Sequence, residues 1–256
     1  MILLFKKVLT SKIAVLLRNT LNIKPVSISK YKFKRWGYSV SDSFLYRTDK
    51  NYKTIFRFSD IPQKFFDLKN TEIELVFFDN KNNELKKMNL NQNKKLNEII
   101  IDKNFLGNKE IYGHFNIFHK SKDKILEDTS FSNRCYIGFG KKNFFSFVHG
   151  NSYVKSKSFY NDVLISNFAN KSLILNFEYN IQESFKQYDK VELFINNPTN
   201  NKIKILINNN NYILSGNEDF KHSFSGFNKI KIMSNCGALR PVVFTYKGDF
   251  FDVHHA

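Results

Sequence analysis

The stretch EIELVFF at residues 72–78, followed by DNKNN at residues 79–83, decides the fold class. Aromatic and aliphatic residues alternate with acidic ones at its start, which is typical of a half-buried strand. The Asn-rich pentapeptide predicts a hairpin turn, because Asn and Asp tolerate left-handed backbone and hydrogen-bond to their own backbone. Similar pairs of strand and turn recur along the chain. We therefore predict an all-β protein.

Further strands are expected wherever short runs of aromatic and β-branched residues lie between Asn-rich breaks. About 220 residues of short strands at this spacing are typical of β-sandwiches or barrels. Asp60 to Leu68 predicts a helical turn, and NNPTNN at 196–201 predicts another turn between strands. The predicted strands are Asn97–Asp102, Ile111–Phe118, Cys135–Phe139, Phe144–His149, Ser172–Tyr179, Glu192–Ile195, Ile203–Ile207, Lys229–Met233, Pro241–Tyr246 and Phe250–His254.

The chain resembles itself, in the same order, at three places. ELVF at 74–77 matches ELFI at 192–195, SNRC at 132–135 matches SNC at 234–236, and FxxVH at 145–149 matches FxxVH at 250–254. The order predicts a duplicated unit of about 100 residues, the size of a sandwich domain. We expect two tandem Ig-like or jelly-roll-like β-sandwich domains, at residues 31–150 and 151–256, after a helix and linker at residues 1–30.

Residues 1–22, MILLFKKVLTSKIAVLLRNTLN, carry apolar side chains at helical spacing and basic side chains largely off that stripe. The basic residues are Lys6, Lys7, Lys12 and Arg18. Lys12 and Arg18 interrupt the apolar run, so we expect neither a transmembrane helix nor a signal peptide. Two interpretations stay open. The helix lies on an anionic membrane surface with its lysines at the headgroups, or it packs on the body of the protein.

The formal net charge is +17, from 40 Lys and Arg against 23 Asp and Glu, and residues 1–50 contribute +9 of it. A basic chain suggests nucleic acid, but only six of the basic residues are Arg, the residue suited to bidentate phosphate and base contacts. Lys, Asn, Ile and Phe also share A/T-rich codons, so genome composition is a second explanation. Nucleic acid is therefore an alternative partner and not the leading one.

The two cysteines, Cys135 and Cys236, fall at matching positions of the repeat. Placed in separate domains, they predict reduced, buried thiols and a cytoplasmic protein. A nucleophilic Cys135 paired with His149 is the alternative.

The chain has no GxGxxG, P-loop, GxSxG, HExxH or CxxC motif. Gly138-x-Gly140 lacks the following helix that a phosphate loop needs. No catalytic residue and no cofactor are predicted, although a divalent metal bound by Asp252 and His254 is considered, because these side chains share one face of a strand. The candidate ligand-binding residues are His149, Asn151, Arg240, Asp252, His254 and His255. A structural role at strand ends is the alternative for each histidine.

Three phrases resemble ones found in uncharacterised bacterial proteins that accompany surface-polysaccharide biosynthesis: YGHFNIFH at 112–119, SFVHGN at 146–151, and LRP at 239–241 with FDVHH at 251–255. The resemblance covers about residues 36–256 and carries over no catalytic residue. It implies a cytoplasmic accessory protein or enzyme of cell-envelope glycan assembly.

Together these features predict a carbohydrate-interacting accessory protein of cell-surface polysaccharide assembly, at the inner face of the membrane. Its partner would be a glycan or a glycan precursor, with an anionic membrane surface for residues 1–22. The alternative is a metal-assisted sugar-modifying enzyme that uses the His149 and His254 region. A nucleic-acid-binding protein is the second alternative.

Overall fold

The computed structural model describes most of the chain from Tyr38 onward. The described residues are 17, 38–90, 96–121, 123, 135–150, 153–158, 164–167, 177–181, 184–226, 229–237 and 239–255. The helix predicted at residues 1–30 therefore lies outside the described residues, apart from Leu17, which is helical and exposed. Within the described part of the chain, no helix has the length and apolar character needed to cross a bilayer.

Nearly all regular structure is strand, as the alternation predicts. From Tyr38 onward, the helices among the described residues are η3 (Asp49–Asn51) and α3 (Ile61–Phe66). Asp60 caps the start of α3, and its side chain accepts a hydrogen bond from the Gln63 backbone. The strands are β1 (Tyr38–Asp42), β2 (Phe44–Arg47), β3 (Lys53–Phe58), β4 (Thr71–Asp79), β5 (Glu84–Leu90), β6 (Asn97–Ile101), β7 (Tyr112–Ser121), β8 (Tyr136–Lys141), β9 (Phe144–His149), β10 (Tyr153–Ser158), β11 (Leu164–Asn167), β12 (Phe177–Ile181), β13 (Lys190–Asn196), β14 (Ile203–Ile207), β15 (Asn210–Leu214), β16 (Asp219–Phe224), β17 (Ile230–Ser234), β18 (Val242–Lys247) and β19 (Phe250–His255).

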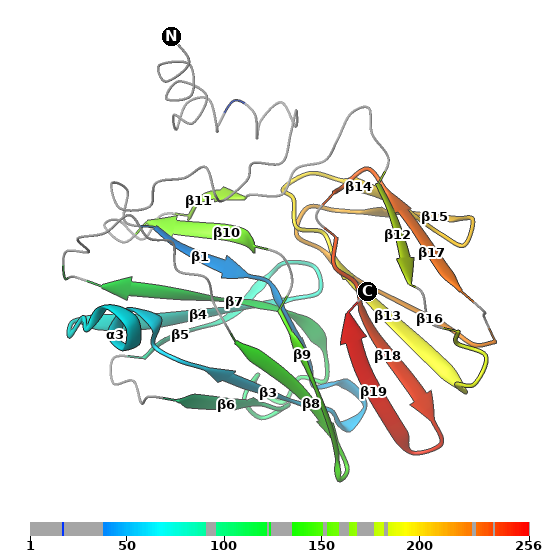
Figure 1. The fold of residues 1–256 in the computed structure, drawn as a ribbon, viewed down its shortest axis with the longest axis horizontal. Coiled ribbons are helices and arrows are strands. Elements are labelled where there is room, and N and C mark those ends of the chain that lie inside the picture. The colour runs from blue at the N-terminus through cyan, green and yellow to red at the C-terminus, as the bar shows by residue number, and fades with distance from the viewer. Residues whose placement is uncertain are drawn as a thin grey trace.

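These strands form four small four-stranded antiparallel sheets in a four-bladed arrangement, with one three-stranded sheet beside them (Figure 1). The first half of the chain holds sheets β2-β7-β4-β5 and β6-β3-β8-β9. The second half repeats the same order in β12-β17-β14-β15 and β16-β13-β18-β19. The three-stranded sheet, β1-β10-β11, pairs a strand of the first half with strands that follow residue 150.

The prediction of two tandem β-sandwich domains, Ig-like or jelly-roll-like, is wrong. The finding that overturns it is the four-bladed arrangement of small sheets, with a larger core that takes residues from both halves. Alternating hydrophobicity shows which face of a strand is buried, but it does not show which sheet covers that face. The domain boundary at residue 150 stays a prediction, and the pairing of β1 with β10 crosses it.

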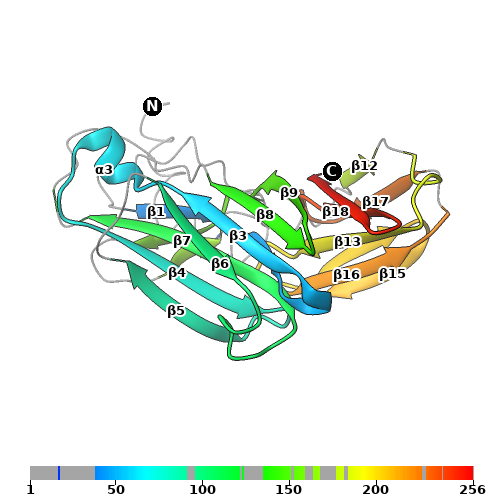
Figure 2. The same ribbon diagram turned by 90° about the horizontal axis from the view of Figure 1, so that it is seen from below.

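Two hydrophobic cores hold the sheets together. The larger is aromatic, with Phe44, Phe56, Phe115 and Phe139 fully buried in the first half. Four residues of sheet β16-β13-β18-β19 join it: Phe194, Val242, Phe244 and Val253. The opposite face of that sheet packs on a second, aliphatic core shared with β12-β17-β14-β15. This sheet therefore buries residues on both of its faces. Figure 2 shows its red hairpin, β18 and β19, beside the green strands β8 and β9 of the first half.

A buried ion pair lies where the halves meet. Arg47, at the end of β2, is fully buried, and its Nη1 lies 2.8 Å from Oε2 of Glu192 on β13. Its Nε and Nη2 donate to the carboxylate of Asp49, at 2.9 and 3.0 Å. The guanidinium also lies over the ring of Tyr52, 4.1 Å from its centroid. Burial disfavours any charge, so these partners are what keeps Arg47 stable there.

The strand predictions hold for most of the regular structure. The runs predicted near residues 72, 97, 111, 135, 144, 192, 203, 229, 241 and 250 correspond to strands of the structure. Of the predicted strand Ser172–Tyr179, residues 177–179 belong to β12, and residues 172–176 lie outside the described residues. The match of Glu74 with Glu192 does not mark equivalent strands, because β4 and β13 hold different places in the repeated order. Both β4 and β13 carry a buried glutamate between hydrophobic neighbours, which explains why ELVF at 74–77 and ELFI at 192–195 are similar in sequence.

Candidate functional site

The outer face of sheet β6-β3-β8-β9 exposes a row of aromatic side chains. Tyr136 on β8 and Phe145 and Phe147 on β9 are 53%, 47% and 41% exposed. The antiparallel register places His149 opposite Tyr136, with the two rings 5.1 Å apart. We call Tyr136, Phe145, Phe147 and His149 the aromatic strip. Large apolar rings normally avoid water, so an exposed row of them suggests a binding surface.

Two glycines on β8 make room for the rings. The register places Gly138 opposite Phe147 and Gly140 opposite Phe145. A Cβ added to Gly138 would come within 2.4 Å of the Phe147 ring, and one added to Gly140 within 2.5 Å of the Phe145 ring. The rings therefore lie over bare backbone on one side and face solvent on the other. Any larger residue at these glycines would displace them.

Basic side chains of β3 flank the rings. Lys53 Nζ lies 5.0 Å from the Phe145 ring centroid, and the guanidinium carbon of Arg57 lies 5.3 Å from that of Phe147. Both separations are in the range of cation–π contacts. Arg57 is also held by Glu98 on β6, at 2.7 Å. The strip thus has hydrogen-bond donors along one side.

Polar groups from distant parts of the chain gather at the His149 end of the strip. His255 on β19 donates through Nε2 to the His149 carbonyl, and Arg240 Nη1 donates to the Gly150 carbonyl at 3.2 Å. Asp42 of β1 lies beside Gly150, since a Cβ added there would be 2.9 Å from its Oδ2. We call Asp42, His149, Arg240 and His255 the polar cluster.

Burial sets the protonation of two members of the polar cluster. It raises the pKa of Asp42 to about 7, against the opposing effect of the Arg240 charge. Burial, together with the Arg240 charge, also lowers the pKa of His255 to about 4. His255 is therefore neutral at pH 7. Because its Nε2 faces a carbonyl, that nitrogen carries the proton.

Three of the six predicted ligand-binding residues come together here: His149, Arg240 and His255. Asp252 instead accepts a hydrogen bond from Ser146 of the neighbouring β9, at 2.7 Å. His254 lies on the opposite face of β19 from His255, as the alternation predicts. Asn151 and the membrane-surface candidates Lys6, Lys7, Lys12 and Arg18 lie outside the described residues.

In the part of the chain that it describes, the structure places no third candidate metal ligand with Asp252 and His254. Among the described residues, no group of three or more His, Cys, Asp or Glu side chains is arranged to hold a metal ion. The metal-assisted enzyme stays a prediction without a candidate centre.

The motifs in the sequence do not mark Tyr136, Phe145, Phe147 and Asp42 as site residues. The signal was present as GFG at 138–140 followed by FFSF at 144–147, which places glycines opposite alternate aromatics in a hairpin. In the sequence, the spacing Gly138-x-Gly140 resembles only part of a phosphate loop. In the structure, these two glycines make room for the rings of Phe147 and Phe145.

The second half of the chain has no such open strip in the same place. Strands β18 and β19 begin 106 residues after β8 and β9, so Phe244 and Val253 correspond to Gly138 and Phe147. Phe244 and Val253 are buried in the larger core, at 0% and 4% exposure. The second half uses this face for packing, and the first half leaves it open.

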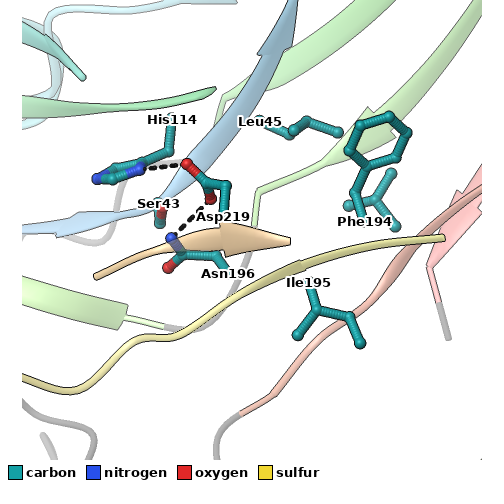
Figure 3. A pocket seen from close by; sticks show the side chains of 8 residues that line it. Ser43, Leu45, His114, Phe194, Ile195, Asn196 and Asp219 are labelled. Carbon is teal, nitrogen blue, oxygen red and sulfur yellow. Dashed lines mark hydrogen bonds and ion pairs between the residues drawn. The ribbon is translucent and has the colours of Figure 1, made fainter. Parts of the chain in front are cut away.

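A second polar feature lies inside the molecule, beside a cavity that is too small for a ligand. His114 on β7 and Asp219 on β16 are both buried, with Nδ1 2.7 Å from Oδ2, and Asn196 donates to the other carboxylate oxygen (Figure 3). The cavity beside them has a volume of about 10 Å³, which is room for about one water. We assign this pair a structural role, because it links β7 of the first half to β16 of the second.

Comparisons with known proteins do not identify the chain. No known family profile matches it, and no curated protein matches it. Among solved structures, the lectin of Pleurotus ostreatus in its apo form aligns with 86% of this chain and 76% of its own, at 7% identity and a TM-score of 0.24. The structure titled as that lectin in complex with GalNAc aligns with 87% and 82%, at 6% identity and a TM-score of 0.20. At such scores the likeness carries no argument about fold or ligand.

Proposed function

We propose that this protein binds carbohydrate through the aromatic strip and the polar cluster. The observation that carries the proposal is the seating of exposed Phe145 and Phe147 over Gly140 and Gly138. Sugar rings have apolar C–H faces that pack on aromatic rings, and hydroxyl groups that bond to planar polar side chains. Donors such as Arg57 and Arg240 lie at the edges of the strip, where hydroxyls of a stacked sugar would reach.

The finer role proposed here is that of an accessory protein in cell-surface polysaccharide assembly. It is supported by the phrases at 112–119, at 146–151, and at 239–241 with 251–255. The second phrase contains Phe147 and His149 of the aromatic strip. A place in the cytoplasm, at the inner face of the membrane, belongs to this proposal. The membrane part of this proposal rests on the basic side chains within residues 1–22.

The test is direct binding to a panel of oligosaccharides built from glucose, galactose, N-acetylglucosamine or galacturonic acid, measured by isothermal titration calorimetry. Phe147→Ala should weaken binding about tenfold, because stacking on an aromatic ring contributes roughly 1 kcal/mol or more. Gly138→Ala should weaken binding as well, although the Phe147 side chain is unchanged, because the new Cβ would displace the Phe147 ring.

The matched control is Ile213→Ala on β15, which removes an apolar side chain that is 67% exposed in the other half. It should bind as the unmodified protein does, and circular dichroism should show all three variants folded. Two results would overturn the proposal. One is unchanged affinity in Phe147→Ala, and the other is binding to a single-stranded oligonucleotide with none to any sugar, since aromatic strips also stack bases.

A further inference from the structure

Arg240 is held differently from the other arginines that the structure describes. Arg47 pairs with Glu192 and Asp49, and Arg57 pairs with Glu98. Within the described part of the chain, Arg240 has no carboxylate within ion-pair distance, and its one hydrogen bond is to the Gly150 carbonyl. It is exposed, so most of its planar set of N–H donors faces solvent.

The position of this guanidinium relates it to the aromatic strip. Gly150 follows His149 directly, so Arg240 lies at the end of the strip. Lys53 lies at the other end, against Phe145. From Phe145 to His149 the strand advances about 13 Å at 3.3 Å per residue. A ligand stacked along the strip would therefore meet a cation at either end.

The nearby acid does not cancel the charge of Arg240. Asp42 is the carboxylate that acts on this guanidinium, and it is largely buried with a pKa of about 7. At neutral pH it is ionised in only part of the molecules. His255, which also faces Arg240, is neutral at that pH. The exposed side of the polar cluster is therefore positive.

We propose that the glycan bound at this site carries a carboxylate, as in a uronic acid, and that Arg240 binds it. This inference rests on the proposed function. A planar guanidinium matches the two oxygens of a carboxylate with parallel hydrogen bonds, whereas a lysine acts as a point charge. A neutral sugar would leave those donors to water.

The experiment compares an oligogalacturonide with the same oligosaccharide after chemical reduction of its carboxyl groups, each titrated into the full-length protein. The acidic form should bind about tenfold more tightly, as expected for a charge-assisted pair of hydrogen bonds. In Arg240→Gln the two should bind alike, and Arg240→Lys should keep only part of the preference. Phe147→Ala should weaken both forms equally.

Two controls separate recognition from the general charge of a +17 chain. Lys204→Gln removes an exposed positive charge from β14, in a different sheet from the aromatic strip, and should keep the preference for the acidic form. Polyglutamate offers carboxylates without sugar rings and should not compete. Raising the salt concentration should narrow the preference without removing it and should leave binding of the neutral reduced form unchanged, because screening acts on exposed charges.

The two proposals fail in different ways. Equal binding of the acidic and reduced forms, with Phe147→Ala still weakening both, would overturn the carboxylate and leave the carbohydrate site. A preference that survives in Arg240→Gln, or that polyglutamate abolishes, would also overturn it. Absence of binding to either form and to every neutral sugar would overturn both proposals.

Discussion

Replacing Arg47 by Met should strongly destabilise the protein, because it leaves Glu192 buried without its main counter-charge. The Glu192 side chain is 1% exposed and forms an ion pair with Arg47 Nη1 at 2.8 Å. It also accepts hydrogen bonds from Lys190 at 2.7 Å, Lys50 at 3.0 Å and Tyr246 at 2.6 Å. Burial alone would raise the pKa of Glu192, but Arg47 and these partners hold it well below the ordinary range. Glu192 thus stabilises the folded state at neutral pH, and that contribution is lost as pH falls through the lowered pKa.

Removing one partner of a buried ion pair costs about 3–5 kcal/mol. We expect the lower end, about 3 kcal/mol, since Lys190 and Tyr246 still bond to Glu192 in the variant. For a chain of this length the melting temperature should fall by roughly 6–12 °C. Urea unfolding followed by circular dichroism measures the free energy directly.

The matched control is Arg57→Met, because the Arg57–Glu98 pair is about half exposed on both sides and should contribute under about 1 kcal/mol. The double variant Arg47→Met with Glu192→Leu should be more stable than Arg47→Met alone, since the buried carboxylate that has lost its arginine is gone. If Arg47→Met costs no more than Arg57→Met, or if the double variant is the less stable, the reasoning is wrong.

Three further outcomes follow from the same structure. Gly113→Ala should cost about 3 kcal/mol in urea unfolding, because its Cβ would lie 2.1 Å from the Phe78 carbonyl oxygen, which is backbone and cannot move aside. Cys135 and Cys236 should react with a thiol reagent only after unfolding, as both are buried, and burial with the Asp42 charge raises the pKa of Cys135. Asp42→Asn should be more stable than the unmodified protein by ~4 kcal/mol at pH 8 and nearly equal to it at pH 4. Burial raises the folded pKa of Asp42 from 3.8 to about 7, so the unmodified protein loses stability as pH rises from the unfolded pKa towards 7. A flat difference between pH 4 and pH 8 would contradict this.

Local patterns in the sequence determine the strands and the side of each that is buried. FFSFVH at 144–149 alternates in the manner of a strand, and the structure has β9 there with Val148 inward and Phe147 outward. The Asn-rich turn after residue 78 likewise joins β4 to β5. These features depend on residues only a few positions apart, so the sequence alone predicts them.

The assembly of the site depends on contacts between residues far apart in the chain. His149, Arg240 and His255 were each singled out from local motifs, and the fold brings them together with Asp42, which no motif marked. The repeat suggested that both halves would be alike. Only the tertiary structure buries Phe244 while it leaves the equivalent position, Gly138, beneath an exposed ring. The physical reason is that alternation specifies a buried face without specifying what covers it. In one half another sheet covers that face, and in the other it is open to a ligand.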